Sequence, residues 1–299
     1  MGRLLKKDIG KLLNSVATIF FDCDGVLWNS HGIIQGAVET IQKLKEMNKN
    51  LLFITNNSSY SRKVILKKFQ QYGFNVKLEE ILSSAYIAAI YAQDIVQAEK
   101  VFVIGSAGMK EELEDVGMKY VSFENEENQV YIAKNFMESF TKEHGIGAVI
   151  VAYDPKFSLH HIAAAMQYLS DPCIPYIATN TDSTFPIGNG KIGPGTGCIV
   201  NAVSTATGRQ PIIVGKPNRL MFDTAMKRYT INSKTSLMIG DRLNTDIVFG
   251  NDCGMQTLCV LTGVTSEKEI IELSSNSSSQ NLLPTCYTDK LSDLLEIED

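Results

Sequence analysis

Short apolar runs alternate with segments of helical periodicity along most of this 299-residue chain. Residues 16–21, 51–54, 212–214 and 237–239 are apolar runs too short for helices, and each stops at polar or glycine residues. Segments such as 38–47 and 62–72 carry apolar residues at helical spacing between them. Strands that alternate with helices form mostly parallel sheets covered on both faces, so we predict an α/β fold of this kind.

The polar residues directly after these runs are the candidates for chemistry, because ligands of such folds bind at the carboxyl ends of the strands. They are Asp22 and Asp24; Thr55, Asn56 and Asn57; Lys216; and Asp241 and Asp246. Carboxylates brought close together repel one another, and a divalent cation with oxygen ligands, above all Mg²⁺, relieves that repulsion. A lysine with hydroxyl and amide donors suits phosphoryl oxygens, and a carboxylate can attack phosphorus. Together these residues predict phosphoryl transfer.

The order of these residues resembles the four motifs of the haloacid dehalogenase (HAD) superfamily. DCDGVL at 22–27, TNN at 55–57, Lys216, and GDRLNTD at 240–246 follow one another as in that family. The resemblance spans nearly the whole chain. It implies a Rossmann-like parallel-sheet core, Mg²⁺ as the cofactor, and an aspartyl-phosphate intermediate.

The resemblance also implies catalytic and metal-binding roles. Asp22 would be the nucleophile, Asp24 the general acid and base, and Lys216 the group that neutralises developing charge. Asp22, Asp24 and Asp241 would ligate Mg²⁺, and Asp246 would reach it through water. The structural alternative is that such aspartates only cap turns and helices.

The spacing between the second and third motifs predicts an inserted domain. Thr55 and Lys216 are 216 − 55 = 161 positions apart, which is far more than one crossover connection needs. We predict a hydrolase core at 1–97 and 209–299, with an inserted α/β cap domain at 98–208. This layout resembles the subgroup of 4-nitrophenylphosphatase, phosphoglycolate phosphatase and pyridoxal phosphatase.

Substrate binding is also assigned by that resemblance. Thr55 and the amides near Asn56 and Asn57 would hold phosphate, while the loop at 179–189 would select the substrate through Phe185. The related pyridoxal phosphatases carry histidine at this position and phosphoglycolate phosphatases an apolar residue, so Phe185 favours 2-phosphoglycolate. The alternative is that Phe185 packs the loop or a dimer interface.

The expected activity is Mg²⁺-dependent hydrolysis of small phosphate monoesters, such as 2-phosphoglycolate and 4-nitrophenyl phosphate. Pyridoxal phosphate and phosphoprotein are alternative substrates, and a phosphomutase is a weaker alternative. A catalytically silent scaffold is a further alternative, opposed by the retained Asp22, Asp24, Lys216 and Asp241, because a silent fold has no need to hold repelling charges together.

The amino-acid composition limits the classes of partner that the protein can bind. The net charge is -5 and the basic residues are scattered, so no basic stripe indicates nucleic acid. No apolar run approaches the roughly 20 residues that span a bilayer, and the six scattered cysteines fit a reducing compartment. We expect a cytoplasmic protein whose partner is a small phosphorylated metabolite, without nucleic acid or membrane. The family resemblance suggests a homodimer through the cap.

Overall fold

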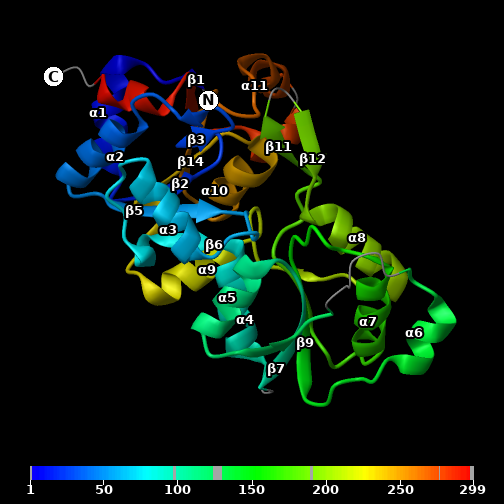
Figure 1. Cartoon of the computed structure of the whole chain (residues 1–299). Helices are drawn as coiled ribbons and strands as arrows, with labels where there is room; N and C mark the ends of the chain where they lie inside the picture. The colour runs from blue at the N-terminus through cyan, green and yellow to red at the C-terminus, as the bar shows by residue number, and fades with distance from the viewer. Residues whose placement is uncertain (1, 97–98, 124–129, 189–190, 276, 297–299) are drawn as a thin grey trace. The chain divides into compact units, whose positions relative to one another are not determined.

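The computed structural model describes the chain except residues 1, 97–98, 124–129, 189–190, 276 and 297–299. The predicted domain limits at 1, 97, 98 and 299 lie outside the described residues, as does residue 189 at the end of the predicted substrate loop. The chain forms two compact units (Figure 1). The first unit is Met1–Thr55, Ile65–Leu82 and Lys216–Asp299, and the second is Asn56–Val64 and Ser83–Gly215. The exact limits of core and cap stay a prediction.

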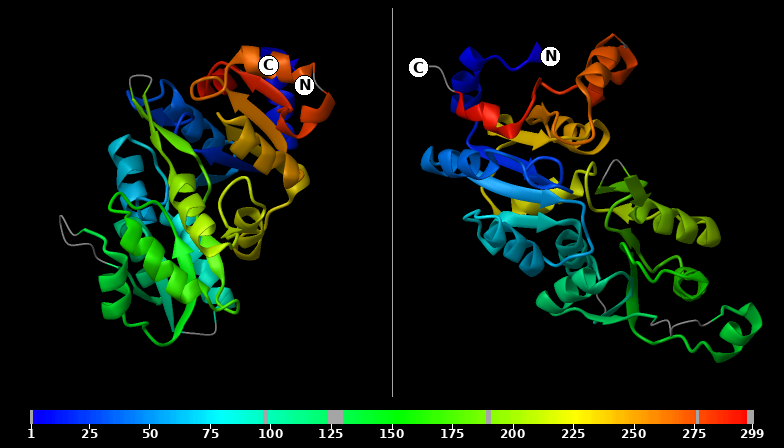
Figure 2. Two further views of the ribbon diagram at one scale, coloured as in Figure 1. Left: turned by 90° about the vertical axis from the view of Figure 1, so that its right-hand side faces the viewer. Right: turned by 45° about the horizontal axis from the view of Figure 1, so that its top comes forward.

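The first unit is built on a seven-stranded sheet in the order β1-β16-β15-β14-β2-β5-β6. All pairs from β1 to β5 are parallel, so the carboxyl ends of β14, β2 and β5 lie next to one another at one edge. The strands run side by side in the right-hand view of Figure 2. They are β1 (Gly2–Arg3), β2 (Thr18–Asp22), β5 (Asn50–Thr55), β6 (Ile81–Ser83), β14 (Ser236–Gly240), β15 (Gln256–Val260) and β16 (Cys286–Thr288).

Helices cover both faces of this sheet because the side chains of each strand alternate. Ile19 and Phe21 of β2 join a core cluster with α1 (Lys6–Ser15), α2 (Ala37–Glu46) and α3 (Arg62–Gln71). Phe20, between them, points to the opposite face, where its ring lies 6.0 Å from Phe222 and 6.5 Å from Phe249. Those two residues belong to α9 (Leu220–Arg228) and α10 (Val248–Asp252).

The second unit has its own parallel sheet, in the order β13-β10-β9-β7-β8. Figure 1 shows α4 and α5 on one side of β7 and β9, and α7 and α8 on the other. The elements are α4 (Ser84–Ile95), β7 (Lys100–Ile104), α5 (Ala107–Asp115), β8 (Lys119–Val121), α6 (Ala133–Ser139), β9 (Ile146–Val151), α7 (Leu159–Leu169), β10 (Tyr176–Ala178), α8 (Thr196–Thr207) and β13 (Ile212–Ile213). The predicted α/β fold, with a parallel-sheet core and an inserted α/β cap, is therefore confirmed.

Two local expectations were wrong. The segment 179–189, predicted as a loop, contains β11 (Thr184–Gly188), which forms an antiparallel hairpin with β12 (Lys191–Pro194). Its strands bury neither face, so they show no apolar alternation. The strand before Lys216 pairs with β10 in the second unit's sheet, although we had grouped its end with those of the core strands.

The remaining short elements lie mostly in the first unit. They are β3 (Trp28–Asn29), β4 (Gly32–Ile33), α11 (Glu267–Ser274), the π-helical turn η3 (Leu243–Ile247), and the 3₁₀ turns at Leu78–Glu80, Ser233–Thr235 and Leu291–Leu295. Across the described ranges, no helix has both the length and the apolar character to cross a membrane.

Candidate active site

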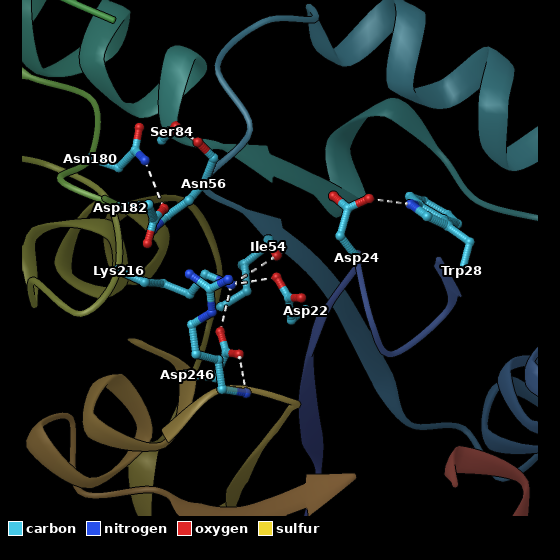
Figure 3. A network of polar contacts seen from close by, with 11 residues as sticks. Asp22, Asp24, Trp28, Ile54, Asn56, Ser84, Asn180, Asp182, Lys216 and Asp246 are labelled. Atoms are coloured by element: carbon cyan, nitrogen blue, oxygen red, sulfur yellow. Dashed lines mark hydrogen bonds and ion pairs between the residues drawn. The ribbon is translucent and has the colours of Figure 1, made fainter. Parts of the chain in front are cut away.

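Asp22, the last residue of β2, places a buried carboxylate at the carboxyl edge of the first unit's sheet. Lys216 Nζ donates to Asp22 Oδ1 at 2.5 Å and to Asp246 Oδ1 at 2.7 Å (Figure 3). Lys216 is only 2% exposed. Burial lowers the pKa of its ammonium, but the two carboxylates outweigh burial, so the net pKa is raised. Lys216 therefore stays charged and ties the end of β2 to the turn after β14.

Three carboxylates form an acidic cluster at this edge. Asp22, Asp241 and Asp246 are buried and offer oxygen atoms that all lie within 4.8 Å of one another. Burial raises the pKa of Asp22 well above its usual range, with Lys216 opposing the shift. Burial, with Asp246 beside it, raises the pKa of Asp241 to about 7. Oxygen-only donors at this spacing suit a hard divalent cation, whose charge would offset the repulsion.

Glycines make room for the carboxylate of Asp241. A Cβ on Gly263 would lie 1.8 Å from Asp241 Oδ2, and one on Gly25, whose φ is +96°, would lie 2.5 Å from it. The same oxygen accepts a hydrogen bond from Val264 N at 2.8 Å. Gly240 makes room for Asp246 in the same way, because a Cβ on Gly240 would lie 2.1 Å from the Cβ of Asp246. The two carboxylates thus occupy niches that a larger residue would close.

Asp24 belongs to a different set of contacts from Asp22. Its Oδ1 accepts a hydrogen bond from Trp28 Nε1 at 2.8 Å, and Figure 3 shows its carboxylate turned toward Trp28. Its side chain is 47% exposed. Cys23, between the two aspartates, is buried in the core cluster on the opposite face, as strand alternation predicts. Burial raises the pKa of the Cys23 thiol well above its usual range, which favours the protonated thiol.

The residues of the predicted second motif divide between the two units. Thr55 ends β5 and is 4% exposed, one residue beyond the position that pairs with Asp22. Asn56 and Asn57 follow it in the second unit. Asn56 Nδ2 donates to Asp182 Oδ2 at 3.0 Å, and Asn57 Oδ1 accepts from the backbone of Ser59 at 2.9 Å. Both amide side chains therefore make local contacts within the second unit.

Comparison with known proteins identifies the family. Residues 19–119 match the family model described as haloacid dehalogenase-like hydrolase, and residues 213–294 match a second, HAD-hydrolase-like model. The chain is 36% identical to human glycerol-3-phosphate phosphatase, over 98% of this chain and 94% of that protein. The chain belongs to the haloacid dehalogenase-like hydrolases. Among its relatives, phosphoglycolate phosphatase 1A of Arabidopsis thaliana is 38% identical over 95% of this chain and 78% of that protein.

A solved structure has the same architecture. Glycerol phosphate phosphatase from Mycobacterium tuberculosis in complex with magnesium superposes with a TM-score of 0.77 at 26% identity, covering 95% of this hydrolase and 77% of that chain. The full-length relatives are named phosphatases, and the alignments span almost all of this chain. The hydrolase is therefore an enzyme of the phosphatase class.

The second unit of the hydrolase contains a polar network that the sequence did not indicate. Asp182 Oδ2 accepts from Asn180 Nδ2 at 2.7 Å as well as from Asn56, and Ser84 Oγ donates to the backbone oxygen of Asn56 at 2.9 Å (Figure 3). These contacts join three segments that are far apart in the chain. A one-dimensional pattern carries no signal for them, although Asn180 and Asp182 lie within the loop predicted to select substrate.

Phe185 lies on β11 of the hydrolase and is 37% exposed. Its ring meets Tyr153 edge-on, with the two ring centroids 5.5 Å apart. Tyr153 is therefore the packing partner that the alternative interpretation of Phe185 requires. Its contact with substrate stays a prediction.

Proposed function

We propose that this hydrolase is a Mg²⁺-dependent phosphatase that cleaves small phosphate monoesters through an aspartyl-phosphate on Asp22. The observation that carries the proposal is the buried carboxylate of Asp22 at the end of a strand. Among the contacts that the structure describes, this carboxylate bonds to Lys216 through Oδ1. The other oxygen, Oδ2, is the atom that would attack phosphorus. The phosphatase relatives and the donor set of the acidic cluster support it.

The first half of the reaction forms the covalent intermediate. A bond forms between Asp22 Oδ2 and phosphorus while the bond from phosphorus to the ester oxygen breaks. Asp24, in its protonated form, gives its proton to the leaving oxygen. Lys216, held by Asp246, compensates negative charge on Asp22 and on the phosphoryl oxygens. Thr55 and the backbone N–H groups of Asn56 and Asn57 bind phosphoryl oxygens, since the amide side chains already have partners.

The second half regenerates the enzyme. Asp24, now ionised, takes a proton from water as the water oxygen bonds to phosphorus, and the bond from phosphorus to Asp22 Oδ2 breaks. Inorganic phosphate leaves and Asp24 is again protonated. Mg²⁺ bound by Asp22 and Asp241, with the backbone carbonyl of Asp24 and Asp246 through water, would supply charge that draws the phosphoryl group toward Asp22 and keeps that carboxylate ionised.

We propose 2-phosphoglycolate as the first substrate to test. A plant relative is named phosphoglycolate phosphatase, and Phe185 places an apolar side chain where the related pyridoxal phosphatases carry histidine. Glycerol 3-phosphate is the second candidate, favoured by the name of the human relative. Pyridoxal phosphate belongs in the same panel as the alternative that Phe185 disfavours.

We also propose that the enzyme pairs with a second copy through its cap. The hairpin β11–β12 presents apolar side chains outward, with Ile187 56% exposed and Ile192 67% exposed. Exposed neighbouring apolar residues are typical of interaction surfaces. Sedimentation of the wild type and of an Ile187→Lys, Ile192→Lys variant would test this: a monomeric wild type would contradict it.

The central test measures phosphate release from these esters and from 4-nitrophenyl phosphate, with Mg²⁺ or EDTA. Asp22→Asn should lower turnover by about 10⁴-fold or more, as expected when a covalent nucleophile is removed. Asp8→Asn, an exposed aspartate of α1, is the matched control and should retain full activity. Acid-quenched wild type should carry hydroxylamine-labile phosphate, and Asp22→Asn should not. Turnover that survives in Asp22→Asn would remove Asp22 as the nucleophile.

A further inference from the structure

A lysine ammonium lies beside the carboxylate to which we assign the proton transfers. Lys68 Nζ, from α3, is 3.9 Å from Asp24 Oδ1, the oxygen that also accepts the hydrogen bond of Trp28 Nε1. All three residues belong to the first unit. The separation exceeds a hydrogen-bonding distance, and both side chains are partly exposed, at 41% for Lys68 and 47% for Asp24. As a salt bridge this contact contributes little to stability.

Aromatic rings, rather than an acidic partner, hold the Lys68 ammonium in place. Its Nζ lies 4.2 Å from the ring centroid of Trp28 and 5.9 Å from that of Tyr72, within the range of cation–π attraction. Trp28 is 2% exposed and is itself packed against Phe69, with ring centroids 4.8 Å apart. The indole is therefore a rigid support. It keeps the partly exposed ammonium of Lys68 next to Asp24, and an ammonium has three N–H groups that can donate hydrogen bonds.

The role of Asp24 in the proposed reaction determines which part of the substrate would lie near the Lys68 ammonium. The group that Asp24 protonates is the ester oxygen of the leaving group, so the first atoms beyond that oxygen lie against Asp24. In 2-phosphoglycolate the carboxylate carbon is two bonds from the ester oxygen. A carboxylate held that close to the ester oxygen would lie near Asp24, and the Lys68 ammonium is 3.9 Å from Asp24 Oδ1. A neutral leaving group offers no such partner.

We infer that Lys68, supported by Trp28, is a specificity-determining residue that selects phosphate esters whose leaving group carries a carboxylate next to the ester oxygen. The inference rests on the proposed function, because it places the leaving group against Asp24. The alternative is that Lys68 only orients Asp24, in which case it would affect all esters alike. Substrate comparison separates the two.

The test compares kcat/KM for 2-phosphoglycolate, glycerol 3-phosphate and 4-nitrophenyl phosphate in the wild type and in Lys68→Met. Methionine keeps most of the length and the helix propensity of lysine but removes its charge. We expect a loss of about 10-fold or more on 2-phosphoglycolate alone, the size expected for one charge-assisted contact. Lys68→Arg should retain the preference. Lys67→Met, an exposed neighbour on the same helix, is the matched control and should change nothing.

Binding can be followed without turnover, because Trp28 is the chain's single tryptophan and touches both Asp24 and Lys68. In an Asp22→Asn background, 2-phosphoglycolate should change the tryptophan emission. Adding Lys68→Met should weaken that titration about 10-fold while leaving the titration with glycerol 3-phosphate as it was.

Each outcome decides the inference. Equal losses on all three esters would assign Lys68 to Asp24 alone, and unchanged kinetics on every ester would leave it without a role; both overturn the inference while the Asp22-dependent phosphatase stands. A wild type that hydrolyses other esters but not 2-phosphoglycolate also overturns it. A wild type without Asp22-dependent activity on any ester removes the proposed function and the inference with it.

Discussion

Replacing Gly263 by alanine should disable the acidic cluster without unfolding the protein. The new Cβ would lie 1.8 Å from Asp241 Oδ2, whereas real Cβ atoms essentially never approach closer than 3.0 Å. The separation of the new Cβ and this carboxylate oxygen must therefore grow by at least 3.0 − 1.8 = 1.2 Å, and the oxygen, at the end of a side chain, is the atom expected to move. A shift of that size breaks its 2.8 Å hydrogen bond from Val264 N.

The magnitude follows from the role proposed for Asp241. Loss of an orienting contact around a metal ligand weakens metal binding by about 10- to 100-fold, and a misplacement of about 1 Å lowers kcat by about 10²-fold. The assay is phosphate release titrated with Mg²⁺, together with thermal unfolding in EDTA. We expect a higher half-saturating Mg²⁺ concentration, a lower kcat and a nearly unchanged melting temperature.

The control is Gly105→Ala in the second unit. Its Cβ would meet the side chains of Ala152 and Met109 at 3.1 Å, so it adds crowding without touching Asp241. Gly105→Ala should leave the Mg²⁺ dependence as it is in the wild type. If Gly263→Ala has wild-type kcat and Mg²⁺ dependence, then the position of Asp241 is not what catalysis requires, and the reasoning fails.

Two further predictions concern buried charge. Lys216→Met should lower the free energy of unfolding in EDTA by about 3–5 kcal/mol, because Asp22 and Asp246 lose their buried partner. Mg²⁺ should restore part of the lost stability. Equal stability of variant and wild type in a urea titration with EDTA would contradict this prediction. Glu112→Ala should cost about 3–5 kcal/mol because Arg62, whose side chain is 11% exposed, loses its bonds to a fully buried carboxylate. The neighbouring exposed pair is the control: Asp115→Ala, which frees Lys63, should cost less than about 1 kcal/mol by the same urea titration.

The sequence alone was sufficient for the fold class and for most of the cluster. Apolar runs such as 16–21 and 237–239 predict parallel strands between helices, and aspartates that follow such runs are expected at the same edge of the sheet. The same reasoning predicts that Asp22, Asp241 and Asp246 lie close together, and the structure places an oxygen atom of each within 4.8 Å of the others. The spacing of the motifs also predicts the insertion between Thr55 and Lys216.

Only the tertiary structure decided which side chains touch. Lys216 follows a strand of the second unit's sheet, yet its ammonium bonds to Asp22, 194 positions earlier in the chain. Gly263 is adjacent to Asp241 only because the chain after β15 returns to the edge of the sheet. In the sequence, Lys68 has the pattern of an ordinary lysine on a helix. Its position over the ring of Trp28 is visible only in the structure. Periodicity reports which face of an element is apolar, whereas contacts between distant segments depend on how whole elements pack, which no local pattern records.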